Sequence, residues 1–102
     1  MKQQELIKRM AGKNPPTVVD VRTGIEFKRG RIPGALHAPG WRIFLGLSRI
    51  PADRQTELVV LCELGPRAQI AKSVLTAYGY RNVDLLEGHM AAWRQAGHPL
   101  ER

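Results

Sequence analysis

Short apolar segments alternate along the chain with segments whose apolar residues recur at helical spacing. Four segments are predicted to be strands, and they cover residues 17–21, 35–38, 58–61 and 83–86. All but 35–38, which follows the turn Pro33-Gly34, are rich in the branched aliphatic residues typical of buried strands. The third, Leu58-Val59-Val60-Leu61, has no polar member. An uninterrupted apolar run of this length predicts a central strand that is covered on both faces.

The first two predicted helices are short. Leu6, Ile7 and Met10 fall on one face of a helix that Pro15-Pro16 limits. Thr23 and Glu26 have the spacing of a capping box, in which each side chain accepts a backbone N–H of the other residue. We therefore expect a second helix to begin at Thr23 and to end at Gly30.

Three further helices are predicted. The segment 41–50 is apolar on most faces and stops at Pro51, so it either packs on the sheet or exposes an apolar patch to a partner. A longer helix begins after a Gly-Pro turn and ends near Gly79; the residues on its predicted buried face are Ala68, Ala71, Leu75 and Tyr78. The last helix covers 90–96, before Gly97 and Pro99.

Strands that alternate with helices predict an α/β fold with a mainly parallel sheet of four or five strands flanked by helices. The 102 residues suffice for one domain, so we expect a single domain over 1–102. Parallel sheets of this kind place their sites at the carboxyl ends of the strands.

Composition excludes several classes of protein. No apolar stretch approaches the length found in a signal peptide or a membrane span. The net charge is +7, but the basic residues are dispersed without aromatic interleaving, so we expect anionic substrates and no nucleic acid. The single cysteine allows neither an internal disulfide nor a cysteine-rich metal cage, and we expect no cofactor and a reducing, cytoplasmic environment.

That cysteine, Cys62, directly follows the predicted central strand and opens a loop that leads into a helix. Backbone N–H groups converge at such a position and the helix dipole favours an anion, so a thiolate is stabilised there. Gly65 permits a tight loop, and Pro66 suits a first helical turn. Arg67 adds a fixed positive charge with several donors. Together these neighbours predict that Cys62 is a nucleophile.

The segment from Cys62 to Arg67 resembles the active-site loop Cys-x-x-Gly-x-Arg of the rhodanese family. Three other blocks resemble the same family in the same order. They are Asp20-Val21-Arg22 with Glu26-Phe27, then Gly30-Arg31-Ile32-Pro33-Gly34-Ala35, and Leu86-Glu87-Gly88-His89-Met90-Ala91-Ala92-Trp93.

The resemblance implies a small rhodanese-like domain and a sulfurtransferase. Such an enzyme takes a sulfane sulfur from thiosulfate or a persulfide onto the Cys62 thiolate, and passes it to cyanide, a small thiol or a protein thiol. It implies that Arg67 binds the anionic end of the donor and that Asp20 and Arg22 support the site. The expected substrate-binding loop comprises Glu63, Leu64, Gly65, Pro66, Arg67 and Ala68. Backbone N–H groups from Leu64 to Ala68 would hold the persulfide.

The sequence departs from the family pattern at a few positions. His37 stands where Asn is common, and His89 replaces a Gly before the last helix; for both we expect a rim or capping role, with proton transfer as the alternative. Glu63 places a negative charge in an anion-binding loop, which predicts weak binding of thiosulfate.

Two alternative functions stay open. Cysteine-dependent phosphatases and arsenate reductases of the same fold have five residues between Cys and Arg, whereas four separate Cys62 from Arg67. Non-catalytic interaction modules of the family usually lack the cysteine that this chain retains.

Overall fold

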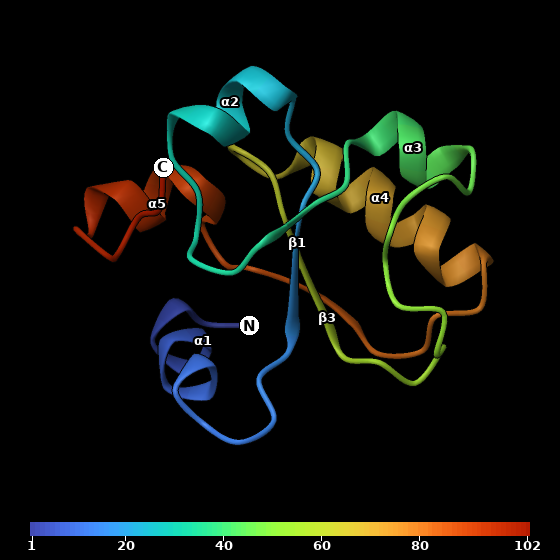
Figure 1. Ribbon diagram of the computed structural model, residues 1–102, viewed down its shortest axis with the longest axis horizontal. Coiled ribbons are helices and arrows are strands. Elements are labelled where there is room, and N and C mark those ends of the chain that lie inside the picture. The colour runs from blue at the N-terminus through green and yellow to red at the C-terminus, as the bar shows by residue number, and fades with distance from the viewer.

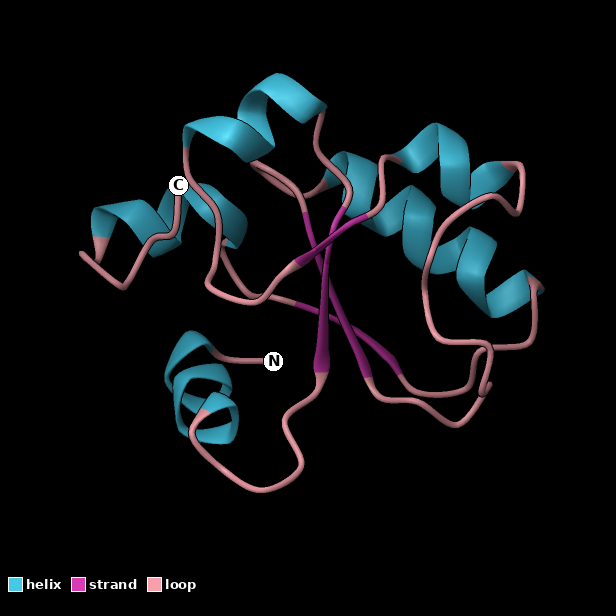
Figure 2. Ribbon diagram, viewed as in Figure 1, coloured by secondary structure: helices cyan, strands magenta, loops and turns pink.

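The computed structural model describes residues 1–102, and strands and helices alternate along it (Figures 1 and 2). In chain order the elements are α1 (Gln3–Met10), β1 (Thr17–Asp20), α2 (Gly24–Arg29), β2 (Leu36–His37), α3 (Gly40–Phe44), β3 (Leu58–Leu61), α4 (Pro66–Ala77), β4 (Val83–Leu85) and α5 (His89–Gln95). None of the helices combines the length and the apolar character needed to cross a membrane.

The four strands form one sheet in the order β2-β1-β3-β4, and every pair is parallel. The predicted α/β fold is confirmed, and the sheet has four strands. As the apolar run 58–61 predicts, β3 is central and all four of its residues are buried. In the register of β1 against β3, Asp20 lies opposite Leu61, so the residues that follow both strands meet at the same edge of the sheet.

Helices cover both faces of the sheet, α1 and α5 on one and α3 and α4 on the other (Figure 1). Consecutive strand residues point to opposite faces, so Val59 belongs to the first core and Val60 to the second. On the first face the side chains of Leu6 and Trp93 are fully buried. On the second face Ala68, Ala71 and Leu75 of α4 pack against the sheet, as their spacing predicts.

The capping box of α2 is present as predicted. The Thr23 hydroxyl accepts a hydrogen bond from the Glu26 N–H at 3.3 Å, and the Glu26 carboxylate accepts one from the Thr23 N–H at 3.0 Å. Gly30 ends the helix. No residue of α2 is buried, and Figure 1 shows the helix lying across the carboxyl end of the sheet. This short helix therefore borders the edge where the loops converge.

The prediction of one helix over 41–50 is wrong. The helix α3 ends at Phe44, and Gly46 follows it with a positive φ of 73°, a conformation that costs glycine little and interrupts the helix. The apolar side chains of this segment then divide. Ile43 and Ile50 enter the core, whereas the exposed ones are Trp41, Phe44, Leu45 and Leu47.

Other departures from the predicted elements are small. Tyr78, predicted on the buried face of α4, is the residue that follows the helix and is 44% exposed; its hydroxyl donates to the carbonyl of Phe44 at 2.8 Å. The second strand is confined to Leu36–His37, because its pairing with β1 extends over these two residues alone.

The division within α3 is testable by a matched pair of substitutions. Phe44→Glu replaces a side chain that is 66% exposed, and should change the free energy of unfolding by no more than about 0.5 kcal/mol. Ile43→Ala removes one that is 2% exposed and should cost about 2–5 kcal/mol. Urea unfolding of both variants measures the difference, and similar losses would show that Phe44 is also part of the core.

Candidate active site

Cys62 immediately follows β3 at the carboxyl edge of the sheet, and its side chain is fully buried. The thiol packs within the core that faces α3 and α4, next to residues such as Val21 and Ala68. Its backbone is fixed on the other face, because the Cys62 carbonyl accepts a hydrogen bond from the Met90 N–H at 3.1 Å. The backbone of Cys62 is thus held by α5, whereas its thiol faces the core on the side of α3 and α4.

Two backbone N–H groups point at the sulfur. Those of Gly65 and Ala68 lie 3.0 and 3.4 Å from Cys62 Sγ, at the beginning of the 12-residue helix α4. Pro66, which was also expected to hold the sulfur, has no N–H to donate. The side chain of Leu64 points to solvent and is 75% exposed. Two converging donors and a helix N-terminus stabilise negative charge on the sulfur.

His89 lies beneath this loop rather than at a rim. Its ring is buried, and its Nδ1 is the acceptor for the Cys62 N–H at 3.3 Å. The ring also contacts Gly65, where an added Cβ would be 3.1 Å from Nε2. Gly65 has a φ of 129°, so both its conformation and this contact require glycine. His89 therefore supports the loop from below.

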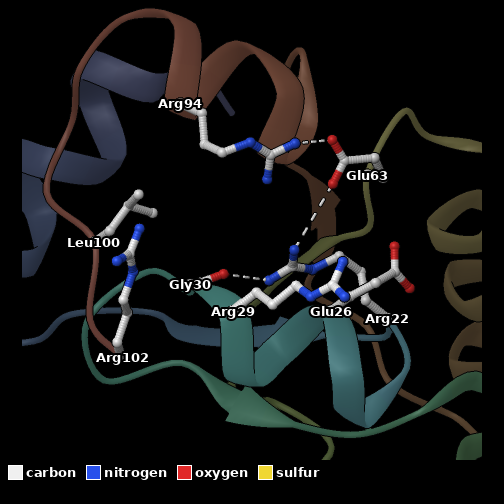
Figure 3. A pocket seen from close by; sticks show the side chains of 8 residues that line it. All are labelled: Arg22, Glu26, Arg29, Gly30, Glu63, Arg94, Leu100 and Arg102. Atoms are coloured by element: carbon white, nitrogen blue, oxygen red, sulfur yellow. Dashed lines mark hydrogen bonds and ion pairs between the residues drawn. The ribbon is translucent and has the colours of Figure 1, made fainter.

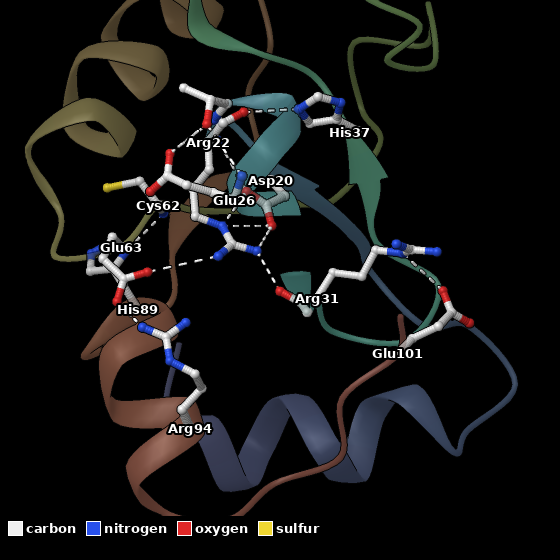
Figure 4. Close-up of polar contacts among 12 residues, drawn as sticks. Asp20, Arg22, Glu26, Arg31, His37, Cys62, Glu63, His89, Arg94 and Glu101 are labelled. Carbon is white, nitrogen blue, oxygen red and sulfur yellow. Dashed lines mark hydrogen bonds and ion pairs between the residues drawn. The ribbon is translucent and has the colours of Figure 1, made fainter. Parts of the chain in front are cut away.

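Asp20 and Arg22 form a buried ion pair at the end of β1 (Figure 4). The Arg22 guanidinium donates from Nη2 to Asp20 at 2.8 Å and to the Gly30 carbonyl at 2.8 Å, and from Nε to both carboxylate oxygens. Because a buried charge is costly unless it is paired and hydrogen-bonded, these contacts hold the ends of β1 and α2 together. This geometry fits the supporting role expected for the pair.

Glu63 carries the negative charge that the sequence places in the loop. Its carboxylate pairs with Arg94 of α5, and one of its oxygens lies 3.7 Å from Arg22 Nη1 (Figure 4). Arg94 and Arg22 thus offset the charge of Glu63 (Figure 3). The repulsion between Glu63 and thiosulfate should therefore be weaker than the sequence predicts.

Arg67 extends from the first turn of α4 to α2. Its guanidinium forms a two-point ion pair with Glu26, at 2.7 and 3.0 Å. The hydrogen bonds from Arg67 lower the pKa of Glu26 to about 2, and burial opposes this shift. The same contact raises the pKa of Arg67, with smaller contributions from Cys62 and Asp20. A carboxylate therefore occupies the guanidinium donors of Arg67.

His37 lies away from the sulfur. Its Nε2 is 2.8 Å from the Arg22 carbonyl, and its ring stacks on Phe27 with the ring centroids 4.4 Å apart. These contacts join β2 to α2, so His37 packs between these elements.

The structure brings together Cys62, Gly65 and Ala68 as the loop motif predicts. The sequence does not indicate the Glu26–Arg67 pair or the contact of Arg94 with Glu63, since these partners are 41 and 31 residues apart. In the sequence, the spacing of Thr23 and Glu26 indicates only that Glu26 belongs to the capping box of α2. It does not indicate that Glu26 also contacts Arg67.

His89 predicts a pH dependence of stability. Its pKa lies below the ordinary value of 6.5, because burial disfavours the charged ring, with a smaller repulsion from the Met1 ammonium. Below about pH 6.5 the unfolded chain therefore binds a proton that the folded chain does not, so the free energy of unfolding falls as the pH falls.

His89→Asn keeps an acceptor near Nδ1 and tolerates the left-handed backbone of this residue, whose φ is 53°. Urea unfolding from about pH 8 to about pH 5 should show a smaller loss of stability in this variant than in the parent protein. Parallel curves for the two proteins would rule out His89 as the source.

Comparisons with known proteins agree on one family. Residues 2–96 match the family described as the rhodanese-like domain. A protein named sulfurtransferase from Allochromatium vinosum is 36% identical over 97 residues, which cover 95% of this chain and 89% of that protein. The thiosulfate sulfurtransferase GlpE of Shewanella oneidensis is 35% identical over 81 residues, covering 78% of this chain and 76% of that one.

Solved structures lead to the same conclusion. The crystal structure of a thiosulfate sulfurtransferase from Pseudomonas aeruginosa superposes with a TM-score of 0.89 and 25% identity. That match covers 100% of this chain and 19% of the larger protein. The family match covers most of the sequence, and the parallel sheet places Cys62 at its carboxyl edge. This chain therefore belongs to the rhodanese-like domain family.

Proposed function

We propose that this chain is a sulfurtransferase that carries a sulfane sulfur on Cys62 as a persulfide. The observation that supports this most is the placement of Cys62 Sγ opposite the N–H groups of Gly65 and Ala68, at the start of α4. A sulfur atom in such a cradle gains stabilisation as an anion, both as the attacking thiolate and as the leaving group of the second step. Relatives that are named sulfurtransferases support the same reaction class.

The reaction consists of two displacements. In the first, the Cys62 thiolate attacks the outer sulfur of thiosulfate, the S–S bond of thiosulfate breaks, and sulfite leaves with the electron pair. In the second, a thiolate or cyanide attacks the outer sulfur of the persulfide, and the electron pair of the broken S–S bond returns to Sγ. Both steps conserve charge and need no redox partner.

The loading step tests this function. After incubation with thiosulfate and removal of the excess, the intact mass of the chain should rise by one sulfur atom, and cyanide should remove that atom as thiocyanate. Cys62 is the one cysteine of the chain, so Cys62→Ser should abolish both changes. Transfer of sulfur by the serine variant, or the absence of any loaded species in the parent protein, would refute the proposal.

The Glu26–Arg67 ion pair bears on donor binding. In our proposal Arg67 binds the oxyanion end of thiosulfate, which must then compete with the Glu26 carboxylate for the same donors. Glu26→Gln keeps the residue type required by a capping box and weakens the ion pair. The KM for thiosulfate should therefore fall by about two- to fivefold, the range expected for a partly exposed ion pair.

Glu101→Gln is the matched control, because Glu101 forms an exposed ion pair with Arg31 at 3.1 Å. That substitution changes the net charge of the chain by the same amount. Steady-state kinetics at fixed ionic strength compare the two variants. Equal changes in KM would mean that only the overall charge matters, and an unchanged KM in Glu26→Gln would remove Arg67 from donor binding.

A further inference from the structure

The helix α3 and the turn that follows it expose a group of large apolar side chains. They are those of Trp41, Phe44, Leu45 and Leu47, and each is between 58% and 66% exposed. We call these four side chains the α3 patch. Single exposed apolar residues are ordinary, but several together mark a surface that another molecule covers.

The α3 patch lies toward one end of the molecule, beside α4 (Figures 1 and 2). Trp41 of the patch and Arg67 of α4 line the same hollow of about 320 Å³. Arg67 belongs to the loop that begins at Cys62. The patch is therefore continuous with the surface next to the active-site loop.

The charged residues around the patch have one sign. No carboxylate occurs between Glu26 and Asp53, and α4, which packs beside α3, has none either. Arg42 and Arg49 flank the patch, and neither forms an ion pair. Arg42 lies over the ring of Trp41 instead, 5.1 Å from its centroid. A molecule that complements this surface must be apolar and negatively charged.

The backbone of the patch distinguishes lipid from protein as the partner. The N–H groups of residues 45–47 all donate to carbonyls of residues 41–43, and the carbonyl of Phe44 accepts the hydroxyl of Tyr78 at 2.8 Å. Of the four side chains, only the indole of Trp41 can form a hydrogen bond. A protein interface carries about one hydrogen bond per 100–200 Å², whereas lipid requires that backbone groups be paired internally. The patch meets the requirement of lipid.

We propose that the α3 patch binds the surface of an anionic phospholipid bilayer. The apolar side chains enter the interfacial layer, where the amphipathic ring of Trp41 is favoured, and Arg42 and Arg49 lie among the anionic headgroups. This contact does not depend on the sulfurtransferase function proposed above. It adds a location to that function, because it brings the Cys62 loop close to the membrane.

The fluorescence of Trp41 reports this contact, because Trp93, the other tryptophan, is fully buried. The full chain is mixed with vesicles of phosphatidylcholine alone or of phosphatidylcholine with phosphatidylglycerol. The anionic vesicles should sediment with the protein, shift its emission to shorter wavelength and protect it from quenching by acrylamide. Neutral vesicles should bind far less protein, and added salt should weaken binding to the anionic ones.

Substitutions locate the contact. Phe44→Glu should weaken binding to anionic vesicles by at least about tenfold, because it removes an apolar side chain and adds a negative charge. Arg42→Gln and Arg49→Gln should each weaken it by about fivefold. These two exposed arginines lie outside the core, so their variants test the proposal even if Phe44→Glu does not fold.

Two matched controls change the charge by the same amounts elsewhere. Leu100→Glu alters an apolar side chain, 38% exposed, in the C-terminal segment (Figure 3), and the C-terminus lies across the molecule from α3 (Figure 1). Lys13→Gln removes an exposed, unpaired cation before β1. Both variants should keep the affinity of the parent protein to within about twofold.

Three results would overturn the proposal. The first is the absence of binding to anionic vesicles; if the chain then self-associates in sedimentation velocity and Phe44→Glu abolishes this, a second copy covers the patch. The second is binding without a change in the emission of Trp41, which indicates adsorption by net charge. The third is an equal loss of affinity in the patch variants and their controls. None of these results depends on sulfur loading of Cys62, so the two proposals are tested separately.

Discussion

The guanidinium of Arg22 is the contact on which the geometry of the carboxyl edge depends. It is almost fully buried, so its charge must be matched inside the protein, and Asp20 supplies most of that match from the end of the same strand. The remaining donors reach the carbonyl of Gly30 and, at longer range, Glu63. One buried cation therefore ties β1, the end of α2 and the active-site loop together. Removing it would leave Asp20 as an uncompensated buried charge.

The Cys62 loop is fixed in a second way, by α5. The carbonyls of Cys62 and Glu63 accept hydrogen bonds from Met90 and Ala91, and the Cys62 N–H donates to His89. A loop that enters from β3 and leaves into α4 is thus also held along its length by a helix distant in sequence. These contacts help to fix the loop in the conformation in which two amides point at one sulfur atom.

Local patterns predicted the architecture of this chain well. The apolar run 58–61 identified the central strand, and Thr23 with Glu26 identified the start of α2, because the signals for these elements lie within a few residues. The prediction of one helix over 41–50 was wrong because Gly46 turns the chain. The spacing of apolar residues does not indicate such a change of backbone conformation. The position of Cys62 and the two N–H groups that point at its sulfur also followed from adjacent residues. The ion pairs around Cys62 could not be predicted in this way. Arg67 pairs with Glu26, and Glu63 with Arg94, only because the fold brings distant elements together.

The two cores of the sheet have different relations to Cys62. Its side chain is a member of the core that faces α3 and α4, whereas the core beneath α1 and α5 consists of other residues. Evolution can therefore repack the α1 side with little effect on the environment of the sulfur, as long as the hydrogen bonds from α5 persist. On the α4 side any change of volume is transmitted to the Cys62 side chain, because close-packed interiors transmit strain. Substitutions tolerated during divergence should accordingly gather on one face of the sheet, and catalytic rate and conformational stability should vary together only on the other.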